Sequence, residues 1–265
     1  TVSVRSLHLL STYCLHLIAG NRMSVSSSSP SPLQYLRDIV TTKQEERQIV
    51  VGILVFDQVE VLDFCGPFEV LSVCRLGGDD DENVTKSPFS VRLVASTKEP
   101  ITTIGGMNVI PHMTMEEIMA SSSSSSSLLD ILIVPGGMGT RTLRFDKPTL
   151  EFIRHQAPRV HILASVCTGS MLLAASGVLP SGTTITTHWK TVETLREWHP
   201  TLIVDKEHSV VKNENSTLYC SAGISAGIDM CFRLVTDLFG ETVARETAKS
   251  MEYTYPEDYQ RRIQF

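Results

Sequence analysis

Short runs of apolar residues alternate along the chain with segments in which apolar and polar positions repeat at helical spacing. The runs are rich in Val, Ile and Leu, which is typical of strands covered on both faces. They occupy residues 48–57, 89–96, 128–137 and 161–165. Strands that alternate with helices form a parallel sheet with right-handed crossovers. We therefore predict an α/β fold, a doubly wound sandwich with helices on both faces of the sheet.

Helix start signals lie between these runs. Gly66 and Pro67 are predicted to begin a helix, with Pro67 near its first position. Thr114 and Glu117 form a capping box, and Pro148 lies at the start of an amphipathic helix. The remaining predicted elements are strands at 107–114, at 183–189 and on either side of a turn at 213–215, and helices at 190–198, 225–240 and 241–253.

Residues 1–47 differ in composition from the rest of the chain. They are rich in serine and arginine, and Asp38 is their first acidic residue. This composition faintly resembles an organelle transit peptide, and a disordered extension is the alternative interpretation. Serine-rich stretches at 23–32 and 121–127 are too polar to pack and are predicted to be a linker and a solvated loop. We predict a disordered extension or transit segment over 1–47 and a folded domain over 48–265.

The bulk properties exclude several classes of function. The chain has 265 residues and a formal net charge of −6 without a long basic run, which argues against nucleic-acid binding. No apolar run approaches the ~18 residues of a membrane span. The six cysteines form no CxxC pair, which indicates free thiols in a reducing compartment, so we expect a cytoplasmic protein unless its first residues direct it to an organelle. The eight histidines show no metal-binding spacing, and we expect neither a metal nor a cofactor.

Reactive residues gather where the predicted strands end. Asp63 follows the first strand, the glycines of 135–137 follow the fourth, and Cys167 follows the strand at 161–165. Later strand ends carry 187–188 and 220–223. Ligands of doubly wound sheets bind beyond the carboxyl ends of the strands. The sequence therefore predicts a ligand site at this edge of the sheet.

Cys167 is the central residue of this predicted site. It lies between a buried strand and a helix over 168–176 that Gly177 closes, so we predict a sharp turn of the nucleophile-elbow type. Gly169 is expected to let the strand and the helix pass closely. The helix start favours a negative charge and therefore a thiolate. The alternative, a buried core cysteine, does not account for a thiol at a strand–helix junction.

The sequence resembles the ThiJ/PfpI superfamily, which is related to the class I glutamine amidotransferases. The similarity rests on VGILVFDQVEVLDFCGPFEVL, DILIVPGGMGT, SVCTGSMLLAASGVL, TTHW and SAGISAGID, which together span about Gln48 to Tyr253. Within the superfamily the likeness is closest to the isocyanide (isonitrile) hydratases. The resemblance implies a flavodoxin-like three-layer sandwich, a homodimer and a small-molecule substrate.

The resemblance also assigns roles to individual residues. It makes Cys167 the nucleophile and Asp63 the acidic residue that contacts the thiol. Thr168 follows the cysteine where proteases of the superfamily carry His, which argues against a Cys-His dyad. The backbone amides of Gly136, Gly137 and Thr168 are the expected oxyanion hole.

Two further residues are candidate pocket residues. His188 lies in the TTHW block, and a structural role is favoured because that block recurs in members with different activities. Cys65 stands where the hydratases often have Thr. It is interpreted as an apolar filler, as is Cys220, with a resolving thiol for oxidised Cys167 as the alternative.

The implied activity is that of a hydro-lyase. The Cys167 thiolate attacks an isocyanide carbon, Asp63 acts as general acid and then as general base, and an N-substituted formamide results. Because two adjacent anions repel, Asp63 is expected to be protonated when the sulfur is ionised. Two alternatives stay open: glyoxalase- or deglycase-type action on reactive carbonyls, and a non-catalytic redox sensor or chaperone-like dimer.

Overall fold

The structure is a computed structural model. It describes residues 30–41, 47–77, 86–121, 128–213 and 217–261. Residues 1–29 and 42–46 of the predicted extension or transit segment, and most of the predicted serine loop, therefore lie outside the described residues.

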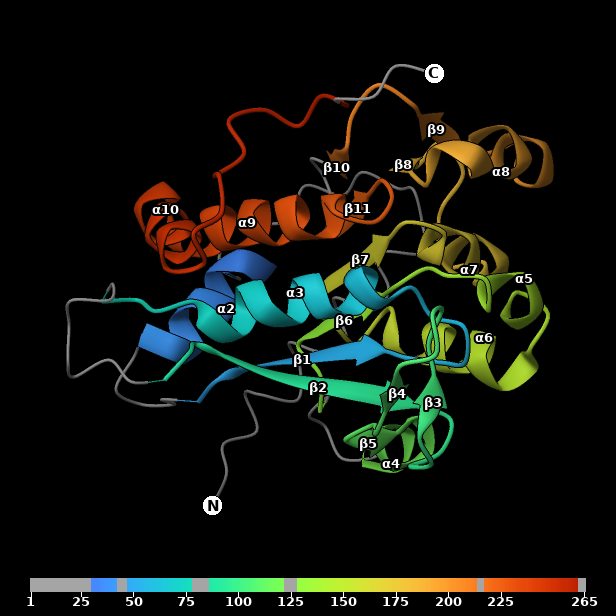
Figure 1. Ribbon diagram of the computed structural model, residues 1–265, viewed down its shortest axis with the longest axis horizontal. Helices are drawn as coiled ribbons and strands as arrows, with labels where there is room; N and C mark the ends of the chain where they lie inside the picture. The colour runs from blue at the N-terminus through green and yellow to red at the C-terminus, as the bar shows by residue number, and fades with distance from the viewer. Residues whose placement is uncertain (1–29, 42–46, 78–85, 122–127, 214–216, 262–265) are drawn as a thin grey trace.

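A seven-stranded sheet forms the centre of the fold (Figure 1). All neighbouring strands are parallel except the first pair at one edge, which is antiparallel. The prediction of an α/β fold with a mostly parallel sheet is confirmed. In order across the sheet the strands are β10 (Val210–Lys212), β11 (Leu218–Ser221), β7 (Ile162–Val166), β6 (Ile131–Val134), β1 (Ile49–Leu54), β2 (Phe89–Ala95) and β5 (Met113–Thr114).

Helices pack on the sheet in two groups, as right-handed crossovers require. In the first group, α3 (Val61–Val73) and α9 (Ala226–Phe239) lie alongside each other (Figure 1). In the second, α6 (Lys147–Gln156) packs against both α4 (Met115–Ser121) and α7 (Gly169–Ser176). The remaining helices are α2 (Pro32–Thr41), α5 (Thr140–Leu143), η1 (Trp189–Thr191), α8 (Val192–Trp198) and α10 (Glu241–Ser250).

Two small strand pairs lie outside the main sheet. β3 (Ile101–Thr102) and β4 (Asn108–Val109) are antiparallel, whereas β8 (Thr184–Thr186) and β9 (Ile203–Asp205) are parallel. The single strand predicted over 107–114 is wrong, since β4 and β5 are separate there. Pro111 lies between them and has no amide to contribute to a continuous ladder.

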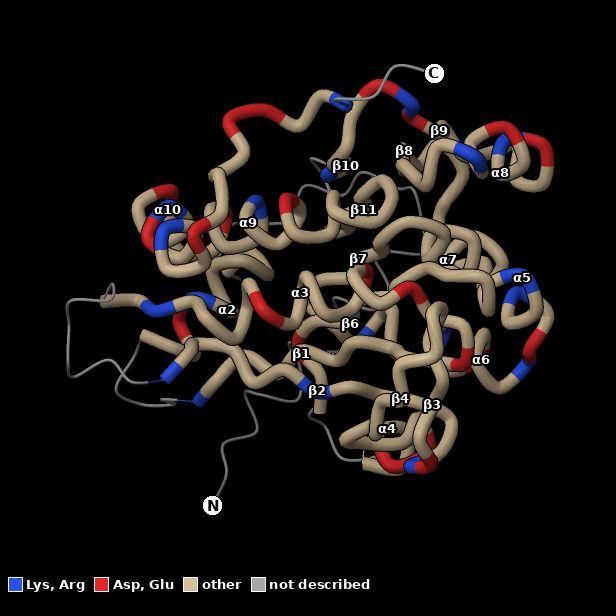
Figure 2. Tube along the Cα trace, in the orientation of Figure 1, with Lys and Arg blue, Asp and Glu red and all other residues tan. Residues whose placement is uncertain are grey.

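The core lies between the sheet and the helices. Every residue of β6 and β7 is buried and none is charged, as expected for strands covered on both faces. Charges of both signs instead follow one another along α8, α10 and the segment after α10 (Figure 2). Among the described residues, no helix combines the length and the apolar character needed to cross a membrane.

Helix α3 begins earlier than predicted. Its first residue is Val61, so Pro67 lies inside the helix rather than near its start. Proline has no amide for the carbonyl four residues before it, which is why it is normally taken to mark a helix start or end. The earlier start places Asp63 in the first turn of α3. Other predicted signals hold, since the Thr114–Glu117 capping box forms both of its hydrogen bonds.

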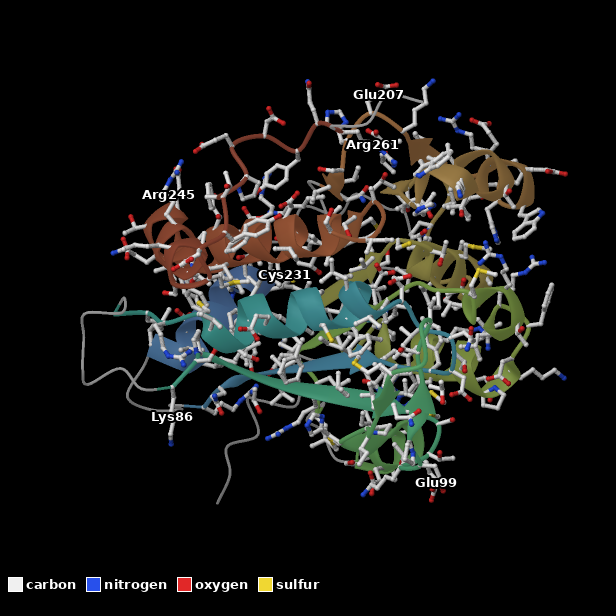
Figure 3. The ribbon with its side chains drawn as sticks, viewed as in Figure 1. Lys86, Glu99, Glu207, Cys231, Arg245 and Arg261 are labelled. Carbon is white, nitrogen blue, oxygen red and sulfur yellow. The ribbon has the colours of Figure 1, made fainter. Side chains whose placement is uncertain are left out.

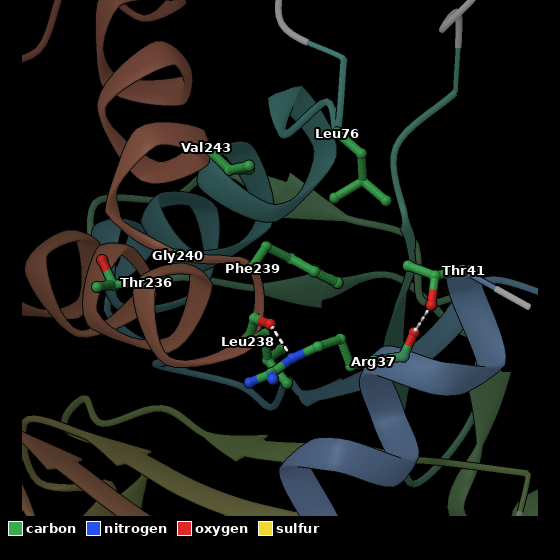
Figure 4. Close-up of a pocket in the computed structure, with 8 residues that line it drawn as sticks. All are labelled: Arg37, Thr41, Leu76, Thr236, Leu238, Phe239, Gly240 and Val243. Carbon is green, nitrogen blue, oxygen red and sulfur yellow. Dashed lines mark hydrogen bonds between the residues drawn. The ribbon is translucent and has the colours of Figure 1, made fainter.

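Helix α2 corrects the predicted domain boundary, since residues 32–41 are helical and not disordered. Leu36 and Ile39 are buried, and the helix packs on α9 and β1. The Arg37 guanidinium donates to the carbonyls of Leu238 (2.6 Å) and Asp237 (3.1 Å) at the end of α9. Figure 4 shows the pocket beside this contact, which α2 lines together with residues of α9 and α10. The ordered fold therefore includes residues of the predicted extension.

Leu36→Ala should destabilise the fold by about 2–5 kcal/mol, because it removes a fully buried side chain and leaves a cavity. Urea unfolding followed by circular dichroism measures the change. Thr41→Ala, at an exposed position in the same helix, should change the free energy of unfolding by no more than about 0.5 kcal/mol. Equal stability of Leu36→Ala and the unsubstituted protein would show that α2 does not belong to the cooperative fold.

Candidate active site

Cys167 occupies the predicted turn between β7 and α7. Its φ is +57°, a left-handed conformation that non-glycine residues rarely adopt. Gly177, with φ +74°, ends α7 as predicted. The cysteine is only 5% exposed, at the carboxyl edge of the sheet. The structure thus contains the elbow that the sequence predicts.

Gly169 allows β6 and α7 to approach closely. A Cβ atom on this glycine would lie 1.9 Å from the carbonyl oxygen of Val134, far inside contact distance. Only glycine fits there, so the packing of α7 on the end of β6 depends on it. This agrees with the role expected from the sequence.

Hydrogen bonds hold both ends of the Cys167 backbone. Its amide donates to the carbonyls of Ser221 and Ala222, each at 3.1 Å. Its carbonyl accepts from the hydroxyls of Ser170 and Thr187, also at 3.1 Å. A strained residue costs roughly 1–3 kcal/mol and persists only when its surroundings hold it. These four hydrogen bonds hold Cys167 in its left-handed conformation.

Asp63 lies beside the thiol at the start of α3. Its side chain is completely buried, and its Oδ2 accepts a hydrogen bond from the Gly136 amide (3.0 Å). Its Oδ1 is buried and, among the described residues, has no hydrogen-bond partner of standard geometry. Burial is the main cause that raises the pKa of Asp63, to about 7. Hydrogen bonds from the Gly136 amide and with the Cys167 thiol act in the opposite direction but are weaker. The carboxyl group therefore holds a proton at mildly acidic pH.

The thiol itself is not activated in its ground state. Burial is the main cause that raises the pKa of Cys167, and the negative charge of Asp63 raises it further. Amides of Thr168 and Ile224 hydrogen-bond to the sulfur and act in the opposite direction. The opposing charge disappears when Asp63 holds the proton, so protonation of the carboxyl group removes one of the causes that raise the pKa of the thiol. The thiolate that the helix start is expected to favour is therefore disfavoured by burial and by the charge of Asp63.

The predicted oxyanion hole is occupied by the protein itself. The Gly136 amide is bonded to Asp63, and the Gly137 amide donates to the Thr168 hydroxyl (3.0 Å). Thr140 also donates to that hydroxyl (3.1 Å). A Cβ on Gly136 would lie 2.5 Å from the Thr168 nitrogen and 2.9 Å from Asp63 Oδ2, so the glycine keeps these groups together. In this conformation the glycine amides position Asp63 and Thr168 instead of facing a ligand.

The candidate pocket residues differ in how they meet the site. The His188 ring accepts from the Lys190 amide (3.3 Å) and packs so closely on Gly223 that a Cβ there would lie 2.2 Å from it. Burial lowers the pKa of His188, which favours the neutral ring and a structural role. Cys65 is half-buried on α3, and burial raises its pKa.

Cys220 is completely buried on β11. Burial raises its pKa to about 11, in keeping with an apolar filler. Among the described residues, Cys65, Cys74, Cys167, Cys220 and Cys231 are all unpaired thiols.

Two residues of the site were not singled out from the sequence. Ile224 supplies an amide to the sulfur, and Thr140 supplies a hydroxyl to Thr168. Thr187, which supplies a hydroxyl to the Cys167 carbonyl, lies at a strand end that the sequence marked as part of the ligand edge, and Ile224 directly follows another. Thr140 follows a glycine-rich loop and carries no signal of its own.

Comparisons with known proteins agree with this geometry. The family model described as the DJ-1/PfpI family matches residues 50–237. The chain belongs to the DJ-1/PfpI family. An isonitrile hydratase from Pseudomonas putida is 35% identical over 204 residues, which cover 77% of this chain and 78% of that protein. Protein DJ-1alpha of Drosophila melanogaster is 27% identical over 158 residues, or 59% of this chain and 68% of that protein.

Solved structures share the DJ-1/PfpI fold. A ThiJ/PfpI family protein from Pseudomonas syringae superposes with a TM-score of 0.64 at 24% identity, covering 90% of this chain and 86% of its own. Drosophila melanogaster DJ-1beta gives a TM-score of 0.61 at 17% identity, over 78% of this chain and all of its own.

Apolar side chains adjoin the site of this DJ-1/PfpI protein. Leu62, Met138, Trp189 and Ile224 are each 36–51% exposed, and each is next in sequence to a residue described above. Arg141 links two of these neighbourhoods, because its guanidinium contacts the Met138 sulfur (3.0 Å) and its charge lowers the pKa of His188. Exposed apolar side chains thus neighbour several site residues in sequence, and the charges of Lys190, Arg261 and Arg141 act on His188.

The raised pKa of Asp63 should make the protein's stability depend on pH. The carboxyl group is protonated up to about pH 7 when folded but loses its proton near pH 3.8 when unfolded. The contribution of Asp63 to the free energy of unfolding is then fully present below about pH 4. It is lost as the pH rises from about 4 through 7, by at most about 1.4 kcal/mol per pH unit. Asp63→Asn should abolish this loss, as measured by urea unfolding from pH 4 to 8.

Cys167→Ala is the control for the cause of this shift. It should keep the pH dependence, because burial and not the thiol is the main cause of the raised pKa. If the unsubstituted protein and Asp63→Asn lose stability in parallel over this range, Asp63 is ionised throughout.

Proposed function

We propose that this protein hydrates isocyanides to N-substituted formamides, with Cys167 as nucleophile and Asp63 as general acid and base. The observation that carries the proposal is the buried carboxyl group placed against a thiol on a strained turn. Similarity to an isonitrile hydratase over 77% of the chain supports the same reaction. The reaction needs only water besides the isocyanide.

The first step forms a covalent bond to sulfur. The Cys167 thiolate attacks the terminal carbon of the isocyanide, and that carbon takes the proton held by Asp63, which gives a thioimidate and leaves Asp63 ionised. Proton sharing within the pair suits this step, because the state with ionised sulfur is the state with protonated carboxyl. A pKa near 7 lets Asp63 give up that proton at neutral pH.

The second step uses Asp63 in the opposite direction. Its carboxylate removes a proton from a water molecule that attacks the thioimidate carbon. Asp63 passes this proton to the nitrogen and then takes up the hydroxyl proton as the C=O bond forms and the C–S bond breaks. The formamide leaves, and both the thiolate and the protonated carboxyl group are restored. The added hydrogen atoms and oxygen come from one water, so the cycle closes without a redox change.

The surroundings of Cys167 favour a substrate with an apolar substituent. Leu62, Met138, Trp189 and Ile224 are exposed apolar residues, each next in sequence to a residue of the site. An isocyanide carries no net charge, and an alkyl or aryl group on its nitrogen gains from burial on such side chains, at roughly 25 cal/mol per Å². We therefore propose small alkyl and aryl isocyanides as the substrate class.

Turnover of cyclohexyl isocyanide by the purified protein tests the proposal, with formamide measured by chromatography. Cys167→Ala should lose all enzymatic turnover, and Asp63→Asn should lose at least about 100-fold, the usual contribution of a general acid–base. Cys74→Ala is a matched control, because its thiol is buried at the opposite end of α3, and it should keep the rate.

Two results would contradict the proposal. Full turnover by Cys167→Ala would exclude the covalent mechanism. No turnover by folded, reduced protein would exclude the activity, and lactate formation from methylglyoxal by the same sample would then assign the site to carbonyl chemistry.

A further inference from the structure

The segment that follows α10 returns to the edge of the candidate site. Gln260 pairs with His208 in an antiparallel bridge, and the Arg261 amide donates to the Glu207 carbonyl (2.8 Å). Figure 3 shows Arg261 beside Glu207. None of the site residues described above belongs to this segment. Arg261 in this segment nevertheless contacts Thr186 and Thr187, which lie close to the Cys167 turn.

The Arg261 guanidinium joins two neighbouring threonines at the end of β8. Its Nη2 donates to the Thr186 hydroxyl (2.6 Å) and to the Thr187 carbonyl (2.9 Å), and its Nε donates to the His208 carbonyl (3.2 Å). Both threonines are completely buried. The Thr187 hydroxyl in turn donates to the Cys167 carbonyl (3.1 Å). Arg261 is thus one residue removed from the backbone of the nucleophile.

A second chain of hydrogen bonds leads from the same segment to the other side of Cys167. The Tyr259 carbonyl accepts from the amide (2.6 Å) and the hydroxyl (2.9 Å) of Ser209. The Ser209 carbonyl accepts from the Ala222 amide (2.7 Å), and the Ala222 carbonyl accepts from the Cys167 amide (3.1 Å). The two chains therefore reach the carbonyl and the amide of one strained residue.

We propose that Arg261 is a positioning residue for Cys167, and that the segment Tyr259–Arg261 holds the cysteine turn from both sides. The inference rests on the proposed function only in taking Cys167 as the reactive thiol. Arg261 touches neither the sulfur nor Asp63 in any hydrogen bond described above. It acts through Thr187, and Tyr259 acts through Ser209 and Ala222.

The chemical consequence follows from where the sulfur lies. Its hydrogen bonds from the Thr168 and Ile224 amides favour the thiolate, and they depend on the left-handed conformation of Cys167. Without Arg261 the Thr187 end of the turn can relax, and the sulfur then loses part of this stabilisation. The thiol should consequently ionise at a higher pH.

Several titratable and charged groups interact with these residues. Asp63 interacts with the sulfur and with Glu60, whereas Asp205, Glu207 and His188 interact with Arg261, and Lys190 and Arg141 act on His188. Because Asp63 and Cys167 share a proton, the measured midpoint belongs to the pair. Arg261→Ala also removes a positive charge, whereas Thr187→Val keeps it, so a shift in Thr187→Val reports geometry.

The test measures alkylation of Cys167 by iodoacetamide as a function of pH, with the modified peptide quantified by mass spectrometry. Arg261→Ala should raise the midpoint by about one pH unit, which corresponds to a tenfold weaker preference for the thiolate. Thr187→Val should raise it similarly. The double variant should shift the midpoint no further than the larger single shift, because both changes break the same chain of contacts.

Arg196→Ala is the matched control. Arg196 also donates to a backbone carbonyl of β9, that of Val204 (2.7 Å), but it has no hydrogen bond to Thr186 or Thr187 among the described contacts. Its loss should lower the melting temperature without moving the midpoint. If Arg261 acted on stability alone, Arg261→Ala would likewise lower the melting temperature and leave the midpoint unchanged.

An unchanged or lowered midpoint in Arg261→Ala would overturn the proposal, whatever the melting temperature. The measurement needs no substrate. If isocyanide turnover fails while the midpoint rises as expected, the proposed function falls and the positioning role of Arg261 stands.

Discussion

The left-handed backbone of Cys167 is the constraint on which the rest of the site depends. The buried strand β7 ends just before Cys167, and helix α7 begins directly after this residue and packs close to β6. Glycine at position 169 makes that passage sterically feasible, and cysteine at position 167 takes the strained conformation that results. Hydrogen bonds with Ser221 at the end of β11, with Thr187 just before η1 and with Ser170 in α7 stabilise this conformation. The thiol is thereby aimed at two amides and one carboxyl group.

The position of Asp63 depends on the same arrangement of strand and helix ends. The early start of α3 carries this residue over the end of the sheet, where the Gly136 amide fixes one of its oxygens. Complete burial makes the ionised carboxylate costly and raises its pKa to about 7. A thiol and a carboxyl group in this arrangement cannot both be charged without strong repulsion. One shared proton is the physical basis of the acid–base role that we propose.

Membership of the DJ-1/PfpI family describes the fold and the elbow, but family membership alone does not specify a reaction. What distinguishes this site is the set of groups around the sulfur. Thr168 follows the cysteine and is held by Gly137 and Thr140, and the neutral ring of His188 is held against Gly223. Among the described residues, Asp63 is the carboxyl group whose charge acts on the Cys167 thiol. This pair is the basis of the proton transfer that we propose.

The sequence by itself determined the architecture and the position of the cysteine turn. Apolar runs with the length and composition of buried strands predicted the parallel sheet, and the position of Cys167 between a strand and a helix predicted the elbow. These are local properties, since periodicity, glycine and capping residues act within a few positions of the chain. Interactions between distant segments decided the rest. Pro67 lies inside α3, residues 32–41 are ordered because Leu36 and Ile39 are buried against distant elements, and the glycine amides bond to Asp63 and Thr168. The path from Arg261 to Cys167 joins residues almost a hundred positions apart, and only the folded chain brings them together.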